Sequence, residues 1–142
     1  MEELLIRDCK KGEEHFIVNK IIEFNSSKLS LEKSYNVIWM NRVIENENKE
    51  IVAGILCKMY CDSCIYVDLL WIDERYRKKG LGTKLLTEVE TKAKEKGCHL
   101  IHLDTFDFQA KDFYLKNGYE IFGTIEDCPH INNKRYYLKK NI

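Results

Sequence analysis

A run of basic residues and glycines at positions 75–83 is the part of this sequence best suited to chemistry. It reads Arg-Tyr-Arg-Lys-Lys-Gly-Leu-Gly-Thr and joins an apolar stretch to an amphipathic one. The first turn of a helix exposes unpaired backbone N–H groups, and its dipole favours negative charge. Glycine lets a bulky anion approach the backbone closely. The run therefore predicts a phosphate-binding turn, with these members: Arg77, Lys78, Lys79, Gly80, Leu81, Gly82 and Thr83.

The spacing of the glycines excludes two common phosphate-binding motifs. A P-loop ends in Gly-Lys-Ser or Gly-Lys-Thr, whereas Thr83 precedes Lys84 here. A dinucleotide-binding loop needs a third Gly or Ala at the position that Leu85 occupies. The pattern that fits is Arg-x-x-Gly-x-Gly, formed by Arg77, Gly80 and Gly82. The alternative is an ordinary solvated basic turn before a helix.

This pattern resembles the pyrophosphate loop of the GNAT superfamily of N-acetyltransferases, which bind acetyl-coenzyme A. A second segment, residues 110–119, reads AKDFYLKNGY and resembles the A-x-x-[FL]-Y-x-x-x-G-[FY] segment of the same superfamily. The resemblance extends from Lys49 to the C-terminus, whereas residues 1–45 agree only in their helix-then-strand order. Asp107 stands where many members carry Asn, which leaves the coenzyme contact of that position open.

The resemblance implies direct transfer of an acetyl group from acetyl-coenzyme A, as cosubstrate, to a primary amine. Tyr114 matches the tyrosine of the second segment, which implies that it donates a proton to the departing thiolate. A tyrosine with its usual pKa near 10 can donate at neutral pH. The alternative is that Tyr114 only packs against its neighbours.

The strand before the basic turn supplies the other expected site residues. Asp68 lies in an otherwise apolar stretch, and the resemblance implies a base on this strand, so Asp68 is the candidate. Its alternative role is a structural hydrogen bond. Strand alternation places Tyr66, Asp68 and Leu70 on one face. The resemblance also implies that the backbone of Leu70, Trp71 and Ile72 binds the pantetheine arm, where the strand leaves its parallel neighbour.

The pattern of apolar residues predicts the elements that position these groups. A helix is expected over residues 12–24, interrupted at 25–27 and followed by a short piece from Ser30 to Ser34. Gly54 is a candidate bulge. Strands are expected at 35–44, 50–60, 64–72, 98–106, 119–126 and 134–140, and helices at 80–96 and 110–117. The prediction is an α/β (α+β) fold with a GNAT-like mixed sheet, mostly antiparallel with a central parallel βαβ unit, and helices on both faces.

Composition narrows the class of protein. The 142 residues predict one domain, residues 1–142, and 44% apolar with 32% charged residues is globular composition. Equal numbers of basic and acidic residues, 23 each, argue against a nucleic-acid partner. No apolar run reaches the roughly 20 residues of a membrane span, and the charged start is unlike a secretory signal, so a cytoplasmic protein is expected. Cys61 and Cys64 form a single C-x-x-C, so no metal site is expected.

An N-acetyltransferase acting on a small-molecule amine is the first functional hypothesis. The alternatives are a protein or peptide N-acetyltransferase that uses the same site and a non-catalytic acyl-coenzyme A-binding module. The acceptor site is expected from the N-terminal helices and the loop at residues 126–134. The aromatic residues Tyr136 and Tyr137 could support a homodimer.

Overall fold

The computed structural model describes residues 1–29 and 37–142, and the chain divides into two compact units, residues 1–35 and 36–142. The first unit contains helix α1 (Glu13–Leu29). Acidic residues lie in its first turn and Lys28 in its last, where their charges complement the helix dipole. The Arg7 guanidinium donates hydrogen bonds of 2.9 and 2.8 Å to the Glu13 carboxylate at the start of the helix.

Helix α1 is longer than the sequence indicated. The interruption predicted at residues 25–27 is wrong, because the helix continues through them to Leu29. The Ser27 hydroxyl donates a hydrogen bond of 2.6 Å to the Phe24 carbonyl, so this polar side chain is satisfied within the helix. The helical piece predicted from Ser30 to Ser34 lies outside the described residues.

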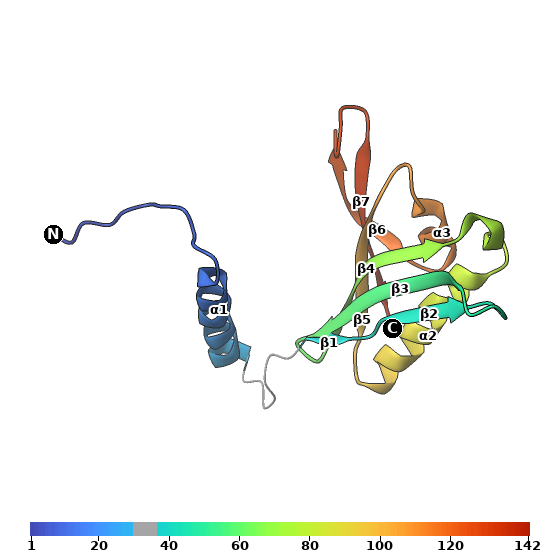
Figure 1. The fold of residues 1–142 in the computed structure, drawn as a ribbon, viewed down its shortest axis with the longest axis horizontal. Coiled ribbons are helices and arrows are strands. Elements are labelled where there is room, and N and C mark those ends of the chain that lie inside the picture. The colour runs from blue at the N-terminus through green and yellow to red at the C-terminus, as the bar shows by residue number, and fades with distance from the viewer. Residues whose placement is uncertain (30–36) are drawn as a thin grey trace. The chain divides into compact units, whose positions relative to one another are not determined.

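The second unit is built on a mixed seven-stranded sheet (Figure 1). Its strands are β1 (Ile38–Trp39), β2 (Arg42–Glu45), β3 (Ile51–Tyr60), β4 (Cys64–Ile72), β5 (Leu100–Phe106), β6 (Glu120–Glu126) and β7 (Lys134–Asn141). Their order is β1-β3-β4-β5-β7-β6, and β2 also pairs with β3. The pair β4–β5 is parallel and joined through helix α2 (Leu81–Glu95), whereas the other pairs among the described strands are antiparallel. The predicted fold class, with a mostly antiparallel mixed sheet and one parallel βαβ unit, is confirmed.

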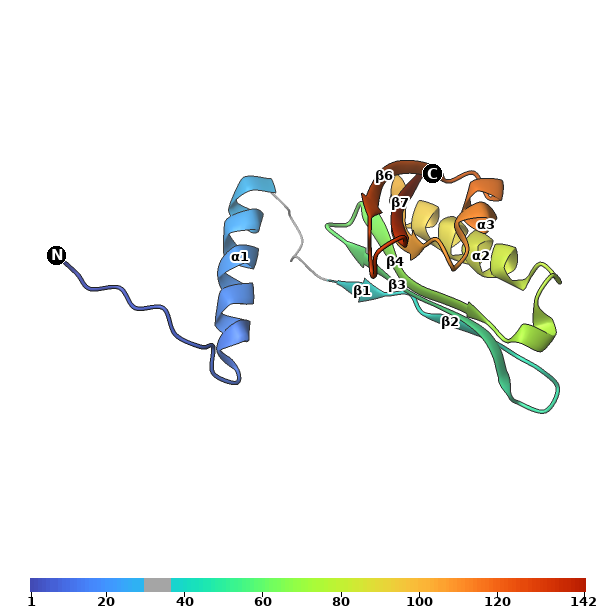
Figure 2. The same ribbon diagram turned by 90° about the horizontal axis from the view of Figure 1, so that it is seen from above.

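One hydrophobic core holds α2 and helix α3 (Lys111–Lys116) against the sheet. Its buried members alternate along the strands and recur at helical spacing in α2: Ala53, Ile55, Cys57 and Met59 in β3, Ile101 and Leu103 in β5, and Leu85, Leu86, Val89 and Ala93 in α2. Figure 2 shows α2 and α3 on the same side of the sheet. Helices on both faces therefore stay a prediction. No helix among the described residues has the length and apolar character needed to cross a bilayer.

Two details of the strands differ from expectation. The strand predicted over residues 35–44 is split, over its described part, into β1 and β2. Between them, the side-chain oxygen of Asn41 accepts the backbone N–H of Cys57 at 3.0 Å, while the Met40 N–H donates to the Cys57 carbonyl at 2.9 Å, so a side chain supplies one of the two hydrogen bonds there. The bulge suggested at Gly54 is also wrong, because Gly54 pairs in register with Trp71 of β4.

Strands β4 and β5 part before β4 ends. Their parallel pairing begins at Cys64 with Leu100 and stops at Val67 with Leu103. From Leu69 to Ile72, β4 pairs with β3 and with no other described strand. The sheet is thus open between β4 and β5 just ahead of α2.

Candidate functional site

A cavity of about 590 Å³ lies at the opening between β4 and β5. Its walls are residues 69–72 at the end of β4, 76–78 and 80–83 before and within the first turn of α2, 104–105 and 108–110 at and after the end of β5, and 113–114 in α3. Every site residue predicted from the sequence lines it except Lys79 and Asp68. Segments far apart in the sequence therefore meet around one cavity, and its role as the coenzyme site stays a prediction.

One extra residue in β4 produces the opening. Opposite β3, Leu69 pairs with Leu56 and Val67 pairs with Cys57, so Asp68 faces no partner and forms a β-bulge. A bulge bends its strand and increases the local twist. The bend coincides with the last parallel pair of β4 and β5, which explains why the two strands separate at this level.

The bulge also changes which side chains share a face. Val67 is buried in the core before it, and Leu70 and Ile72 pack against the same core after it. The expectation that Tyr66, Asp68 and Leu70 lie on one face is therefore wrong, because the extra residue shifts the alternation by one. Asp68 is exposed and lies outside the cavity wall, so its role as a base stays a prediction.

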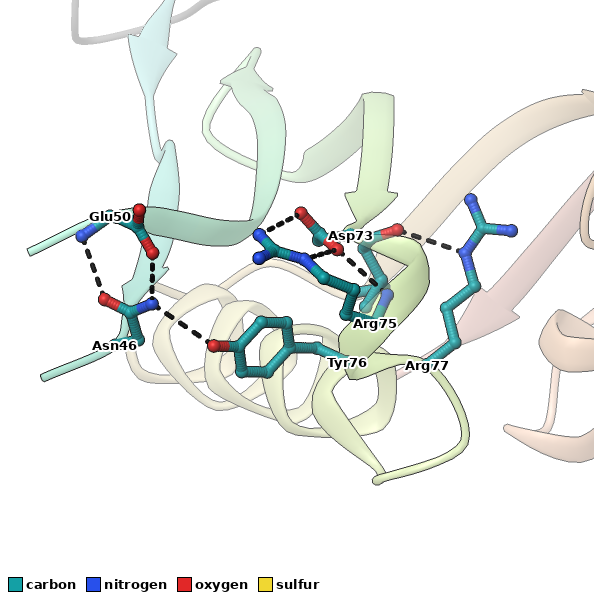
Figure 3. A network of polar contacts seen from close by, with 7 residues as sticks. Asn46, Glu50, Asp73, Arg75, Tyr76 and Arg77 are labelled. Carbon is teal, nitrogen blue, oxygen red and sulfur yellow. Dashed lines mark hydrogen bonds and ion pairs between the residues drawn. The ribbon is translucent and has the colours of Figure 1, made fainter. Parts of the chain in front are cut away.

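The first part of the loop that leaves β4 is fixed by side-chain contacts (Figure 3). Asp73 accepts the backbone N–H of Arg75 at 2.9 Å and the Arg75 guanidinium at 3.0 and 3.1 Å. The hydrogen bond from Arg75 is the main cause that lowers the pKa of Asp73. The Asn46 amide donates to the Tyr76 hydroxyl at 3.2 Å and to Glu50 at 2.7 Å. These contacts preset the loop that carries the basic residues.

The three basic residues of the turn do not play equal parts. The Nε of Arg77 donates to the Ile72 carbonyl at 3.1 Å, and Figure 3 shows its other two nitrogens pointing away from that bond. Lys78, in left-handed backbone with φ of 61°, lines the cavity with Arg77. The ammonium of Lys79 instead lies 5.2 Å from the ring centre of Tyr76. Two of the three cations are thus available to an anion in the cavity.

Helix α2 begins at the cavity with free N–H groups. Its N-cap, Gly80, has φ of 78°, and the first helical hydrogen bond runs from the Lys84 N–H to the Gly80 carbonyl at 3.0 Å. The N–H groups of residues 81–83 precede that bond and have no partner in the helix. A Cβ built on Gly82 would lie 2.8 Å from Cζ of Phe113, so glycine allows α3 to approach α2.

Tyr114 is a wall residue of the cavity, and its hydroxyl stays protonated. It is only 6% exposed, and its ring packs edge-on against Phe113 and Tyr119. Burial, helped by the negative charge of Asp104, raises the pKa of Tyr114 to about 12. The hydrogen bonds among the described residues include none from its hydroxyl. A buried phenol that remains protonated and unpaired can donate to a leaving group.

Asp104 is a wall residue that the sequence did not single out. The Tyr66 hydroxyl donates to Oδ2 of Asp104 at 2.9 Å, and Arg135 donates to Oδ1 at 2.9 and 2.6 Å. Burial and this hydrogen bond raise the pKa of Tyr66 to about 12, with a smaller effect of Asp68. The available signal was a carboxylate inside an alternating apolar strand, the same signal that selected Asp68.

Metal ligation was not expected at this site. Within residues 1–29 and 37–142, no group of three or more His, Cys, Asp or Glu side chains is placed to hold a metal ion. The chemistry available in the cavity is that of cations, helix N–H groups, a phenol and a carboxylate.

Comparisons with known proteins agree with this arrangement. An Acetyltransferase (GNAT) family model matches residues 4–119. A crystal structure of an acetyltransferase from Bacillus cereus superposes with a TM-score of 0.90, at 38% identity and over 98% of each chain. An aminoglycoside 6′-N-acetyltransferase solved with coenzyme A shares the fold, with a TM-score of 0.66 at 19% identity over 82% of this chain and 80% of its own.

A curated relative adds a similarity in sequence. Blasticidin-S acetyltransferase of Streptomyces morookaense is 42% identical over 84 residues, which is 58% of this chain and 61% of that protein. The chain spans about three fifths of the length of the curated relatives that it matches. The prediction made from the two motifs is confirmed at the level of the family: the chain belongs to the acetyltransferase (GNAT) family.

Proposed function

We propose that this chain is an acetyl-coenzyme A-dependent N-acetyltransferase that acts on the primary amine of a small molecule. One observation carries the proposal: a single cavity joins the free N–H groups of α2, the guanidinium of Arg77 and the protonated hydroxyl of Tyr114. Relatives whose names give them acetyltransferase activity on blasticidin S and on aminoglycosides support the reaction and the class of acceptor.

The residues around the cavity fit the parts of the coenzyme. The start of α2, with Arg77, Lys78 and the hydroxyl of Thr83, suits a diphosphate because N–H groups and cations converge there. The stretch Leu70–Ile72 suits the amide-bearing arm, because β4 has left β5 at this level. Lys79, predicted from the sequence as a further contact, does not line the cavity and is left out of this set.

Acetyl-coenzyme A, when bound, supplies a thioester whose carbonyl carbon forms a bond to the acceptor nitrogen and loses its bond to sulfur. Tyr114 is proposed to donate its hydroxyl proton to that sulfur. Asp68 is proposed to take one proton from the acceptor ammonium, so that the nitrogen attacks with a free electron pair. The second nitrogen proton returns to Tyr114, and one proton is released to solvent for each acetyl group transferred.

The test measures thiol release with a panel of amines for Tyr114→Phe and Asp68→Asn. Removing a general acid costs about 10²-fold or more, so Tyr114→Phe should lower kcat by that factor. Tyr119→Phe is the matched control: Tyr119 is equally buried, but its hydroxyl donates to Glu90 at 3.0 Å and lies outside the cavity wall. Its kcat should stay within about twofold of wild type, because the reacting groups are untouched.

Three results decide between the possibilities. A kcat for Tyr114→Phe equal to that of the wild type rules out its role as the acid, and the same result for Asp68→Asn rules out that base. Turnover of peptides in preference to small amines would favour a protein acetyltransferase. A folded protein without measurable affinity for acetyl-coenzyme A in calorimetry would remove the whole proposal. A cytoplasmic location, a single domain over residues 1–142 and a homodimer stay predictions.

A further inference from the structure

Asp104 occupies a special place in the sheet. It is the first residue of β5 after Leu103, the last residue paired with β4, so it stands at the mouth of the opening between the two strands. Its side chain is 16% exposed and lines the cavity. A carboxylate that is mostly withdrawn from water, at the edge of a cavity, needs partners to hold its charge.

Asp104 has such partners, and they come from the strands on both sides. Tyr66 on β4 donates to Oδ2, and Arg135 on β7 donates twice to Oδ1. The guanidinium of Arg135 is itself held over the rings of Phe106 and Tyr137, at 5.5 and 5.4 Å from their centres. A carboxylate accepts about four hydrogen bonds, so Oδ2 keeps room for one more donor. The carboxylate is therefore oriented, and not saturated, by these contacts.

The charges of the cavity wall are unevenly distributed. Among the described residues of the wall, Arg77 and Lys78, in the loop before α2, are the cations, and Asp104 on β5 is the one carboxylate. The cations suit the diphosphate of the coenzyme in the proposed function. The carboxylate has no use there, since it would repel a phosphate. The negative charge of Asp104 also contributes to the raised pKa of Tyr114, so the two side chains are close enough to interact electrostatically.

We propose that Asp104 binds the cationic amine of the acceptor and places its nitrogen beside Tyr114, which makes Asp104 a specificity-determining residue of the transferase. This inference rests on the proposed function and adds to it the charge of the acceptor and the residue that selects it. The site favours amines that arrive as ammonium ions and disfavours neutral or anionic acceptors. Asp68, at the bulge and outside the cavity wall, keeps the separate role of proton acceptor.

The ion pair with Arg135 offers a competing explanation, because Asp104 could serve only to join β5 to β7. The variant Arg135→Gln separates the two roles: it removes the ion pair and keeps the carboxylate. A purely structural Asp104 requires Asp104→Asn and Arg135→Gln to change the KM of the acceptor to a similar extent. A binding Asp104 requires them to differ in the KM of the acceptor.

The experiment measures thiol release with kanamycin, blasticidin S and spermidine as acceptors, at several salt concentrations. Asp104→Asn should raise the KM of each cationic acceptor about 10- to 100-fold, the usual loss for a charge-assisted hydrogen bond. The KM of acetyl-coenzyme A should stay within about twofold, because Asp104 is not in the coenzyme half of the wall. Arg135→Gln should raise the KM of the acceptor by less than about threefold. Salt should raise that KM in the wild type and hardly alter it in Asp104→Asn.

The unpaired guanidinium left in Asp104→Asn could prevent folding, so the double variant Asp104→Asn/Arg135→Gln is compared with Arg135→Gln alone. An unchanged KM of the acceptor in either comparison overturns the inference, as does an increase for Arg135→Gln equal to that for Asp104→Asn. Failure of the proposed function looks different: the wild type then acetylates none of the amines. In that case calorimetric titration of the same amines decides, and equal or absent binding by wild type and variant overturns the inference too.

Discussion

The contact between Gly82 and Phe113 supports a prediction whose size follows from the structure. A Cβ at position 82 would lie 2.8 Å from Cζ and 3.0 Å from Cε2 of the Phe113 ring. Carbon atoms in contact sit about 3.5 Å apart or more, so Gly82→Ala must displace the ring by about 0.7 Å. Phe113 is packed between the core and the cavity and precedes Tyr114, so the displacement affects both packing and the site.

The change in stability is the difference of two effects. Forcing an extra methyl group into a packed contact costs about 1–3 kcal/mol. Replacing glycine by alanine in a helix stabilises by about 1 kcal/mol, and by less in the first turn. The expected net loss is about 1 kcal/mol in the free energy of unfolding, or about 3–5 °C in Tm for a domain of this size. The affinity for acetyl-coenzyme A should also fall, because the methyl group enters the wall beside the N–H groups of residues 81–83.

Urea unfolding and calorimetric titration of acetyl-coenzyme A measure the two effects. Gly123→Ala is the matched control, because the nearest atom to its Cβ would be Cβ of Tyr137 at an ordinary 3.8 Å. Phe113→Leu should make room for the new methyl group, so the double variant with Gly82→Ala should lose less stability than the sum of the single variants. A stable Gly82→Ala with wild-type affinity, or additive single variants, would refute the steric argument.

Two further predictions concern the coenzyme and the acid. Arg77→Ala should raise the Kd of acetyl-coenzyme A about 10-fold, because a charge-assisted contact is lost. Lys79→Ala should change that Kd by less than about twofold. Equal effects of the two variants in calorimetric titration would contradict the different positions of the two cations. Because the pKa of Tyr114 is about 12 when folded and near 10 otherwise, its contribution is full below pH 10 and lost as pH rises toward 12. Urea unfolding between pH 8 and 11.5 should show a loss of about 2 kcal/mol in the wild type beyond that in Tyr114→Phe, and parallel curves would contradict it.

Local patterns in the sequence were enough to predict most of the frame. The bounds of β4, Cys64–Ile72, agree with prediction because turn residues and a charged loop flank an apolar run. The start of α2 was equally readable from Gly80 and Gly82. The continuation of α1 past residue 25 was not, because polar residues such as Ser27 are tolerated on a helix surface when their hydroxyls bond backwards to the helix.

The parts of the candidate site that escaped prediction depend on contacts between distant segments. The bulge at Asp68 is a mismatch between β4 and β3. No glycine or proline lies at the bulge in either strand, so no local pattern indicates it. Asp104 lies at the opening because the pairing of β5 with β4 stops at Leu103, one residue before it. Lys79 was grouped with Arg77 by proximity in sequence, whereas its ammonium lies over the ring of Tyr76. Pairing between strands and side-chain direction decide these cases, and neither can be read from a single local pattern.

The opening between β4 and β5 has a consequence for how such a protein diversifies. Because it arises from one surplus residue in the backbone of β4, it does not depend on the identity of any one side chain on its rim. Side chains on the rim of the opening can therefore be exchanged while the backbone at the start of α2, where the coenzyme is proposed to bind, keeps its shape.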